Sequence, residues 1–129
     1  MDLQIIADNK FYSLFVNAQK NRALLKIRGY WKAREVVPDY LPDWSKVTTI
    51  LKKDFTLITD ATEMKTHPQD VRALHEEVQT IIVKAGVKKI AEIVKDDIAE
   101  MQLNSMARKT HLPKKNFKTA REAELWLDE

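Results

Sequence analysis

The side chains able to do acid–base or metal chemistry are few and poorly spaced in this sequence. The three histidines, His67, His75 and His111, show no His-Glu-x-x-His or other metal-binding spacing. Cysteine is absent, which removes disulfides, thiolate nucleophiles and thiolate metal sites together. No serine lies in a Gly-x-Ser-x-Gly elbow. We therefore predict no catalytic residue, no metal site and no cofactor, and we interpret the histidines as surface or capping residues.

Glycine is equally scarce, because Gly29 and Gly86 are the only two. Two isolated glycines cannot form a Walker phosphate loop or the glycine fingerprint of a dinucleotide-binding turn. Nucleotide binding by either route is therefore excluded. An enzyme is the least favoured class, since catalysis needs a base, nucleophile or metal held by a second group. The alternative is an active site formed by residues that are scattered in the sequence and converge in three dimensions.

The segment from Asp60 to Asp70 is the first candidate for binding a partner or a ligand. It joins an expected strand to the start of an expected helix, where open α/β sheets place such contacts and where free amides attract anions. The alternative is structural, with Thr66 as the helix N-cap and Asp60 as a turn residue. The candidate binding residues of this segment are Asp60, Thr62, Lys65, Thr66 and His67.

A second candidate, made of Tyr30, Trp31 and Lys32, follows another expected strand. Large amphipathic rings beside a cationic group are typical of contact surfaces. Packing in the core is the competing interpretation, and it applies more to Trp31 than to Tyr30. We expect Trp44 and Trp126, which lie on apolar helix faces, to be core residues.

Basic residues gather between Arg108 and Arg121, where six lysines and arginines occur without an intervening acid. Such a stretch could meet the phosphates of nucleic acid or an anionic membrane surface. However, Phe117 is its one aromatic residue and Pro113 interrupts it. We interpret it as a solvated basic edge. Since the remaining charges are interspersed and sum with this stretch to only +3, nucleic-acid binding is not expected.

The elements that would position these residues begin with three strands. Aromatic and aliphatic runs separated by polar turns predict strands over 3–7, 11–16 and 23–30, paired as an antiparallel meander. A change of apolar spacing to three or four residues then predicts a helix over 38–52, with prolines around its first turn. A short buried strand over 55–59 follows.

The clearest element is the helix before Gly86, which supplies its stop. Thr66-His67-Pro68-Gln69 has a capping-box pattern, and the apolar residues between Val71 and Ala85 form one face. Further along we expect a strand over 87–94 and a helix from Asp96 or Asp97 to about His111. A strand-like connection over 116–118 should follow. A capping box at Thr119 then opens a last helix, whose Leu125 and Trp126 we expect to dock on the core. The strand–helix alternation predicts parallel pairing, so the chain is an α/β protein with a mixed sheet.

Length and composition fit one domain spanning residues 1–129. Of the 129 residues, 44% are hydrophobic and 32% are charged, a mixture typical of globular proteins rather than disordered chains. The sequence has neither a signal-peptide pattern at its start nor an apolar run of the roughly 20 residues that cross a bilayer. We therefore expect no transmembrane segment and a cytoplasmic location.

The whole chain resembles the small bacterial STAS/SpoIIAA-like proteins. The resemblance is carried by the residues at 26–31 and 35–41, by Thr59-Asp60-Ala61-Thr62-Glu63-Met64, and by Phe117 with the residues at 122–127. It implies a single-domain SpoIIAA-like mixed β-sheet with an N-terminal antiparallel meander, followed by alternating strands and helices. It also implies a regulatory module that binds partner proteins.

The resemblance to the wider STAS class also implies a kinase partner. In that class the kinase phosphorylates a serine at the start of the helix after a central strand. In this sequence the corresponding residues, His67 to Asp70, include no serine, and the Asp-Ser-Ser-Gly pattern is missing. Thr66 is the nearest hydroxyl, a few residues earlier. Switching by phosphorylation in the manner of those proteins is therefore not expected.

Two functions follow. The first is a non-enzymatic regulatory or protein-interaction module that binds an unidentified protein partner through the two candidate segments. The alternative rests on similarity to the CRAL-TRIO lipid carriers: a carrier that holds a lipid or other small apolar ligand between the sheet and the 38–52 helix. The sequence leaves the oligomeric state open: an apolar edge strand would invite pairing, the first strands are candidates for that edge, and a homodimer is one option because two-fold dimers are the commonest oligomers.

Overall fold

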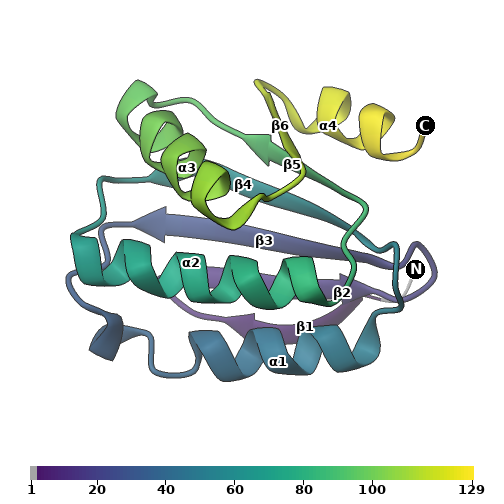
Figure 1. The fold of residues 1–129 in the computed structure, drawn as a ribbon, viewed down its shortest axis with the longest axis horizontal. Coiled ribbons are helices and arrows are strands. Elements are labelled where there is room, and N and C mark those ends of the chain that lie inside the picture. Colours follow the sequence, from purple (N-terminus) through teal and green to yellow (C-terminus); the bar gives the residue numbers. More distant parts are fainter. Residues whose placement is uncertain (1–2) are drawn as a thin grey trace.

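Six strands, four α-helices and one short 3₁₀ helix make up residues 3–129, the part of the chain that the computed structural model describes (Figure 1). The strands are β1 (Leu3–Asp8), β2 (Tyr12–Asn17), β3 (Arg22–Gly29), β4 (Thr56–Met64), β5 (Lys89–Ile93) and β6 (Lys114–Phe117). The helices are the 3₁₀ helix Arg34–Val36 and α1 (Tyr40–Ile50), α2 (Gln69–Lys84), α3 (Asp97–Thr110) and α4 (Ala120–Leu127).

The strands form one mixed sheet in the order β1-β2-β3-β4-β5-β6. The first three are antiparallel neighbours, whereas β3, β4, β5 and β6 pair in parallel. Each parallel connection contains a helix, as a crossover between parallel strands requires. The predicted meander, the predicted alternation and the mixed α/β sheet are confirmed.

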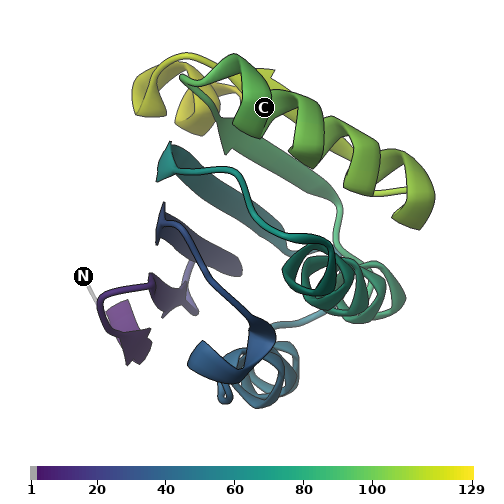
Figure 2. The same cartoon turned by 90° about the vertical axis from the view of Figure 1, so that its left-hand side faces the viewer.

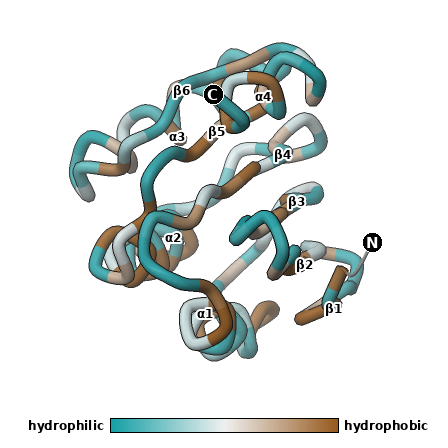
Figure 3. Tube along the Cα trace, turned by 90° about the vertical axis from the view of Figure 1, so that its right-hand side faces the viewer, coloured by the Kyte–Doolittle hydropathy of each residue, from teal (hydrophilic) through white to brown (hydrophobic). Residues whose placement is uncertain are grey.

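The two faces of the sheet are covered unequally. Helices α1, α2 and α3 pack on one face, and α4 lies on the other, over β4, β5 and β6 (Figures 2 and 3). The main core fills the space between the sheet and the first three helices, and a smaller core of Ile58, Ala91, Ile93, Ala123 and Leu127 lies beneath α4. The face of β1, β2 and β3 on the α4 side is not covered by a helix of the described residues.

An apolar row crosses this open face. Ile5, Phe15, Leu24 and Ile58 are successive cross-strand partners, and Ile5 is 64% exposed. A groove of about 240 Å³ lies beside α4 and is lined by Phe15, Leu24, Ile58 and Ile93 among others. The β1 strand is an edge of the sheet, as the sequence predicted for the first strands, so its outer backbone groups have no partner strand among residues 3–129.

The helix boundaries follow local signals in most places. Asp96 caps α3 by accepting a hydrogen bond from the Ala99 amide, and Thr119 caps α4 by accepting one from the Glu122 amide. Gly86 ends the α2 region with φ +90, and a Cβ there would lie 2.8 Å from Lys53 Cγ. The predicted caps at Asp96 and Thr119 and the predicted helix stop at Gly86 are therefore confirmed.

Two local predictions are wrong. Helix α2 begins at Gln69 with Pro68 as its N-cap and without a side-chain cap, so Thr66 lies two residues before the N-cap and forms no capping box. In α4, Leu125 is 61% exposed, and the residues buried against the sheet are Ala123 and Leu127, with Trp126 partly buried beside them. The capping-box pattern at Thr66 fails because it needs His67 to be helical, a conformation that the following proline disfavours, and Pro68 itself is extended with ψ 168.

Candidate functional site

The two candidate segments meet at the carboxyl edge of the parallel strands, which faces the viewer in Figure 2. Gly29 ends β3 with φ +67, and its carbonyl oxygen accepts a hydrogen bond from the Lys65 amide at 3.0 Å. Arg34 adds a second link, because its amide donates to the Asp70 carboxylate at 3.2 Å. The segment after β3 and the segment after β4 therefore form one continuous surface.

Trp31 anchors the first segment from inside the protein. Its side chain is fully buried, and its indole Nε1 donates to the carbonyl oxygens of Phe11, at 3.1 Å, and Arg28, at 3.0 Å. The indole stacks on the His67 ring with the centroids 4.9 Å apart. Trp31 therefore holds the edge in place and offers no surface to a partner, in agreement with the core interpretation.

His67 and His75 form a buried hydrogen-bonded pair, which corrects their interpretation as surface or capping residues. Their rings are parallel within 6°, and His67 Nδ1 lies 3.1 Å from His75 Nε2. His67 Nε2 lies 3.1 Å from the Gly29 carbonyl oxygen, which can only accept, so this nitrogen carries the proton. His67 Nδ1 then accepts from His75 Nε2, and the remaining His75 nitrogen faces the Tyr40 hydroxyl at 3.5 Å.

This chain of donors and acceptors fits two neutral histidines. Burial lowers the pKa of His67 from 6.5 to about 4, against an opposing hydrogen bond to Gly29. Burial and then the neighbouring His67 lower the pKa of His75 to about 3. A proton added to the pair would place a positive charge in a desolvated site, and burial opposes that charge on both rings.

The amide side chain of Gln102 in α3 fixes the backbone of the same loop. Its Oε1 accepts from the His67 amide at 3.0 Å, and its Nε2 donates to the His67 carbonyl oxygen at 3.2 Å. His67 is therefore held by its ring from the sheet side and by its backbone from α3. The loop from Lys65 to Pro68 is preorganised by contacts from three separate parts of the chain.

The exposed part of this edge consists of Tyr30, Lys32, Lys65 and Thr66, which we call the edge surface. Tyr30 is 55% exposed, and the other three side chains are also exposed. An exposed aromatic ring beside two ammonium groups and a hydroxyl can stack on an apolar group and bind acidic or hydrogen-bonding groups. No catalytic pair of nucleophile and base is formed by these four residues.

Asp60 and Thr62 do not belong to the edge surface. Strand β4 continues to Met64, five residues beyond the predicted end at Thr59, so both side chains lie within the strand. Asp60 is a cross-strand partner of Lys26 and Ile93 and lines the groove on the open face. Its Oδ1 accepts from both the amide and the hydroxyl of Thr62, at 3.0 and 2.7 Å. The two residues are engaged with each other.

Sequence reasoning missed His75 and Gln102. A signal for His75 was present, because position 75 lies inside the apolar stripe formed by Val71, Leu74 and Val78 and is therefore directed toward the sheet. Gln102 had no such signal. Its role depends on α3 lying next to the loop before α2, a contact between segments far apart in the sequence.

The basic stretch is only partly a solvated edge. Lys114 has a side chain that is only 9% exposed and pairs with the buried Glu92 at 2.9 Å, while its ammonium also contacts Asn104 and Asn116. Burial raises the pKa of Glu92, and Lys114 acts against that rise. Lys115 lies over the rings of Phe117 and Trp126. These lysines therefore serve the fold at the β5–β6 side of the sheet.

The interior of the main core leaves little free space. The cavity between the sheet and helices α1, α2 and α3 is about 30 Å³ and is lined by apolar side chains together with Thr59, His75, Gln79 and Glu92. Such a volume accommodates water rather than a lipid. This cavity therefore offers no lipid-sized space between the sheet and the first helix, and an apolar ligand there stays a prediction.

Within residues 3–129, no three His, Cys, Asp or Glu side chains gather closely enough to hold a metal ion. None of the helices in the same range is long and apolar enough to cross a membrane.

Solved structures share this arrangement of strands and helices. An uncharacterized protein from the DUF3478 family with a SpoIIAA-like fold, from Shewanella loihica PV-4, aligns with 98% of this chain and 92% of its own, with a TM-score of 0.61 and 17% identity. The fold is SpoIIAA-like. SiaC of Pseudomonas aeruginosa aligns with 91% of this chain and all of its own, with a TM-score of 0.59 and 9% identity.

The SpoIIAA-like fold confirms the architecture that the resemblance in the sequence implied. Identities of 17% and 9% carry the fold and not a function. No family model and no curated protein matches the sequence. The function of this SpoIIAA-like chain therefore has to be argued from its own surface.

Proposed function

We propose that this chain is a non-enzymatic regulatory module that binds a protein partner through the edge surface of Tyr30, Lys32, Lys65 and Thr66. The observation that carries the proposal is the link between the two segments. Gly29 accepts from Lys65, and Trp31 stacks on His67, so exposed groups from two loops are held on a preformed scaffold. Interfaces built on preorganised residues lose less entropy when a partner binds.

The composition of the edge surface favours a partner with acidic and apolar groups. Tyr30 offers a large ring with few rotatable bonds, and Lys32 and Lys65 offer two positive charges beside it. Aromatic residues are enriched at the centre of interfaces, and charges steer the encounter. A non-enzymatic role agrees with the engagement of His67 and His75 in an internal pair rather than with a nucleophile. The cytoplasmic location stays a prediction from the sequence.

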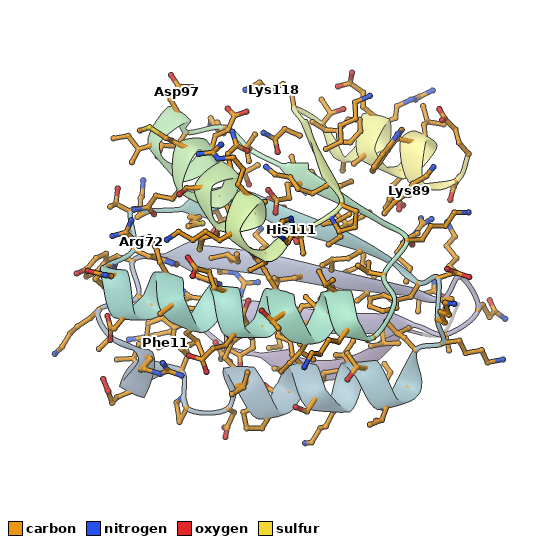
Figure 4. All side chains as sticks on the ribbon, viewed as in Figure 1. Phe11, Arg72, Lys89, Asp97, His111 and Lys118 are labelled. Atoms are coloured by element: carbon orange, nitrogen blue, oxygen red, sulfur yellow. The ribbon has the colours of Figure 1, made fainter. Side chains whose placement is uncertain are left out.

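A pull-down with the full chain as bait tests this proposal. Tyr30→Ala and Lys65→Ala are expected to lose a partner that the wild type retains, because both side chains are exposed and neither forms a side-chain hydrogen bond or ion pair within residues 3–129. Lys118→Ala, an exposed lysine elsewhere on the chain (Figure 4), is the matched control and should retain it. Retention of every partner by both edge variants would refute the site.

Transport of an apolar ligand is the second candidate, and the groove on the open face favours it. Phe15, Leu24, Ile58 and Ile93 line about 240 Å³ next to α4. Native mass spectrometry of freshly purified protein tests the idea, because a carrier retains a ligand of defined mass. If the wild type carries no ligand, and its spectrum differs from that of Phe15→Ser only by the mass of the substitution, this function is refuted.

A further inference from the structure

One arginine stands apart from the rest of the partly buried cationic groups. Four arginines among residues 3–129 are not fully exposed. Arg22, Arg28 and Arg34 each have a carboxylate partner, the closest at 2.8 to 3.9 Å. Arg72 has no carboxylate partner within residues 3–129, and its Nε is buried there without a hydrogen-bond partner. Buried polar groups are nearly always paired, so an orphaned one points to a missing ion or water.

Arg72 lies in a polar groove between α2 and α3 (Figure 4). The groove has a volume of about 140 Å³, and its polar lining consists of Gln69, Arg72, Glu76, Gln102, Ser105 and Lys109. It therefore contains two cations, two amides and a hydroxyl that face one space from two helices. Gln102 is fixed by its two bonds to His67, which makes this wall of the groove rigid.

One carboxylate in the groove opposes an anion. Glu76 pairs with Lys109 at 3.5 Å, and no ion pair joins Glu76 to Arg72. The two cations and one carboxylate leave a net charge of +1 in the groove. Arg72 is consequently the group whose charge is available to a ligand, and Glu76 limits how tightly an anion binds.

We propose that this groove binds a phosphoryl oxyanion, with Arg72 as its anchor. The guanidinium fork matches two oxygens of such a group, and Arg is the residue suited to bidentate recognition of phosphate. A carboxylate in a bidentate pair directs both of its oxygens at Arg72, whereas a phosphoryl group keeps further oxygens for Ser105, Gln69 and Lys109. A tetrahedral ion is therefore better suited than a planar carboxylate to the donors of both helices.

The proposal is independent of the edge surface, since its residues lie on α2 and α3 and include none of the four edge residues. The phosphoryl group has two sources that share this chemistry: free phosphate, or a phosphorylated side chain of another protein. Inorganic phosphate and O-phosphoserine serve as the two probes. Equal affinities indicate the free ion, and tighter binding of phosphoserine indicates a phosphorylated side chain.

The test is a nuclear magnetic resonance titration of the full chain at constant ionic strength. Phosphate is expected to shift the Arg72 side-chain Nε–H signal and the Ser105 amide. Arg72→Gln should weaken phosphate binding about ten- to hundredfold, the range for charge-assisted hydrogen bonds. Glu76→Gln should strengthen it several-fold, because the opposing charge is removed.

Arg121→Gln is the matched control, since it removes the same charge from an exposed position on α4. It should change the affinity by less than about twofold, as expected for a distant screened charge. Three results would overturn the proposal: phosphate produces no shift in α2 and α3, Arg72→Gln binds phosphate as the wild type does, or acetate binds as tightly as phosphate.

Discussion

Acidification from pH 7.5 to pH 5 is expected to destabilise the fold through His67 and His75. Both residues have a pKa near 6.5 when unfolded, and burial lowers the folded values to about 4 and about 3. The unfolded chain therefore binds more protons in this window, and stability rises with pH. The stabilisation is complete above pH 6.5 and is lost as the pH falls toward the folded values.

The size of the effect follows from these values. At pH 5 an unfolded histidine of pKa 6.5 is almost fully protonated, whereas either folded ring stays almost neutral. Each residue then costs about 2 kcal/mol relative to pH 7.5, and the pair costs about 4 kcal/mol. This is a large share of the roughly 5–15 kcal/mol that stabilises a typical domain.

Urea unfolding at pH 7.5, 6 and 5 measures the effect. The double variant His67→Gln/His75→Gln is less stable at every pH but should lose most of the pH dependence, because neither amide titrates. His111→Asn is the control: His111 is exposed with φ 57, which asparagine tolerates. The raised pKa of Glu92 acts in the opposite direction, but it is common to all variants and cancels in the comparison. Equal pH dependence in the wild type and the double variant would refute the buried pair.

Three further outcomes are expected. Lys114→Met leaves Glu92 buried without its cation, so urea unfolding should show a loss of about 3–5 kcal/mol; Glu92→Gln combined with Lys114→Met should recover part of it. Thr119→Ala should cost about 1 kcal/mol through the lost helix cap, while Thr66→Ala should change thermal stability by less than about 0.5 kcal/mol because Thr66 caps nothing. If the chain dimerises through β1, Ile5→Lys should shift its sedimentation coefficient to that of a monomer.

Each of these outcomes has a result that contradicts it. Full stability of Lys114→Met would show that Glu92 is protonated or solvated rather than paired. A larger loss for Thr66→Ala than for Thr119→Ala would reverse the assignment of the two caps. A monomeric wild type would leave no role for the β1 edge in dimerisation.

The sequence by itself determined the elements and their order. The meander, the alternation of strands and helices and the caps at Asp96 and Thr119 depend on periodicity and on hydrogen bonds within four residues. The carboxyl edge was also predictable, since parallel strands place their following loops together. Tyr30 was correctly favoured over Trp31 as the exposed ring.

Only the tertiary structure decided which polar residues are inside. His67 is buried because Trp31, Gly29 and His75 surround it, and Gly29 and Trp31 belong to a segment distant from His67 in the sequence. The length of β4 depends on pairing with β3 beyond Asp60, which no local pattern specifies. The environment of Arg72 depends on the packing of α3 beside α2, because α3 contributes no carboxylate to the groove that Arg72 lines. Periodicity reports which face a residue occupies, but burial of a charge or ring depends on the partner that folding brings to it.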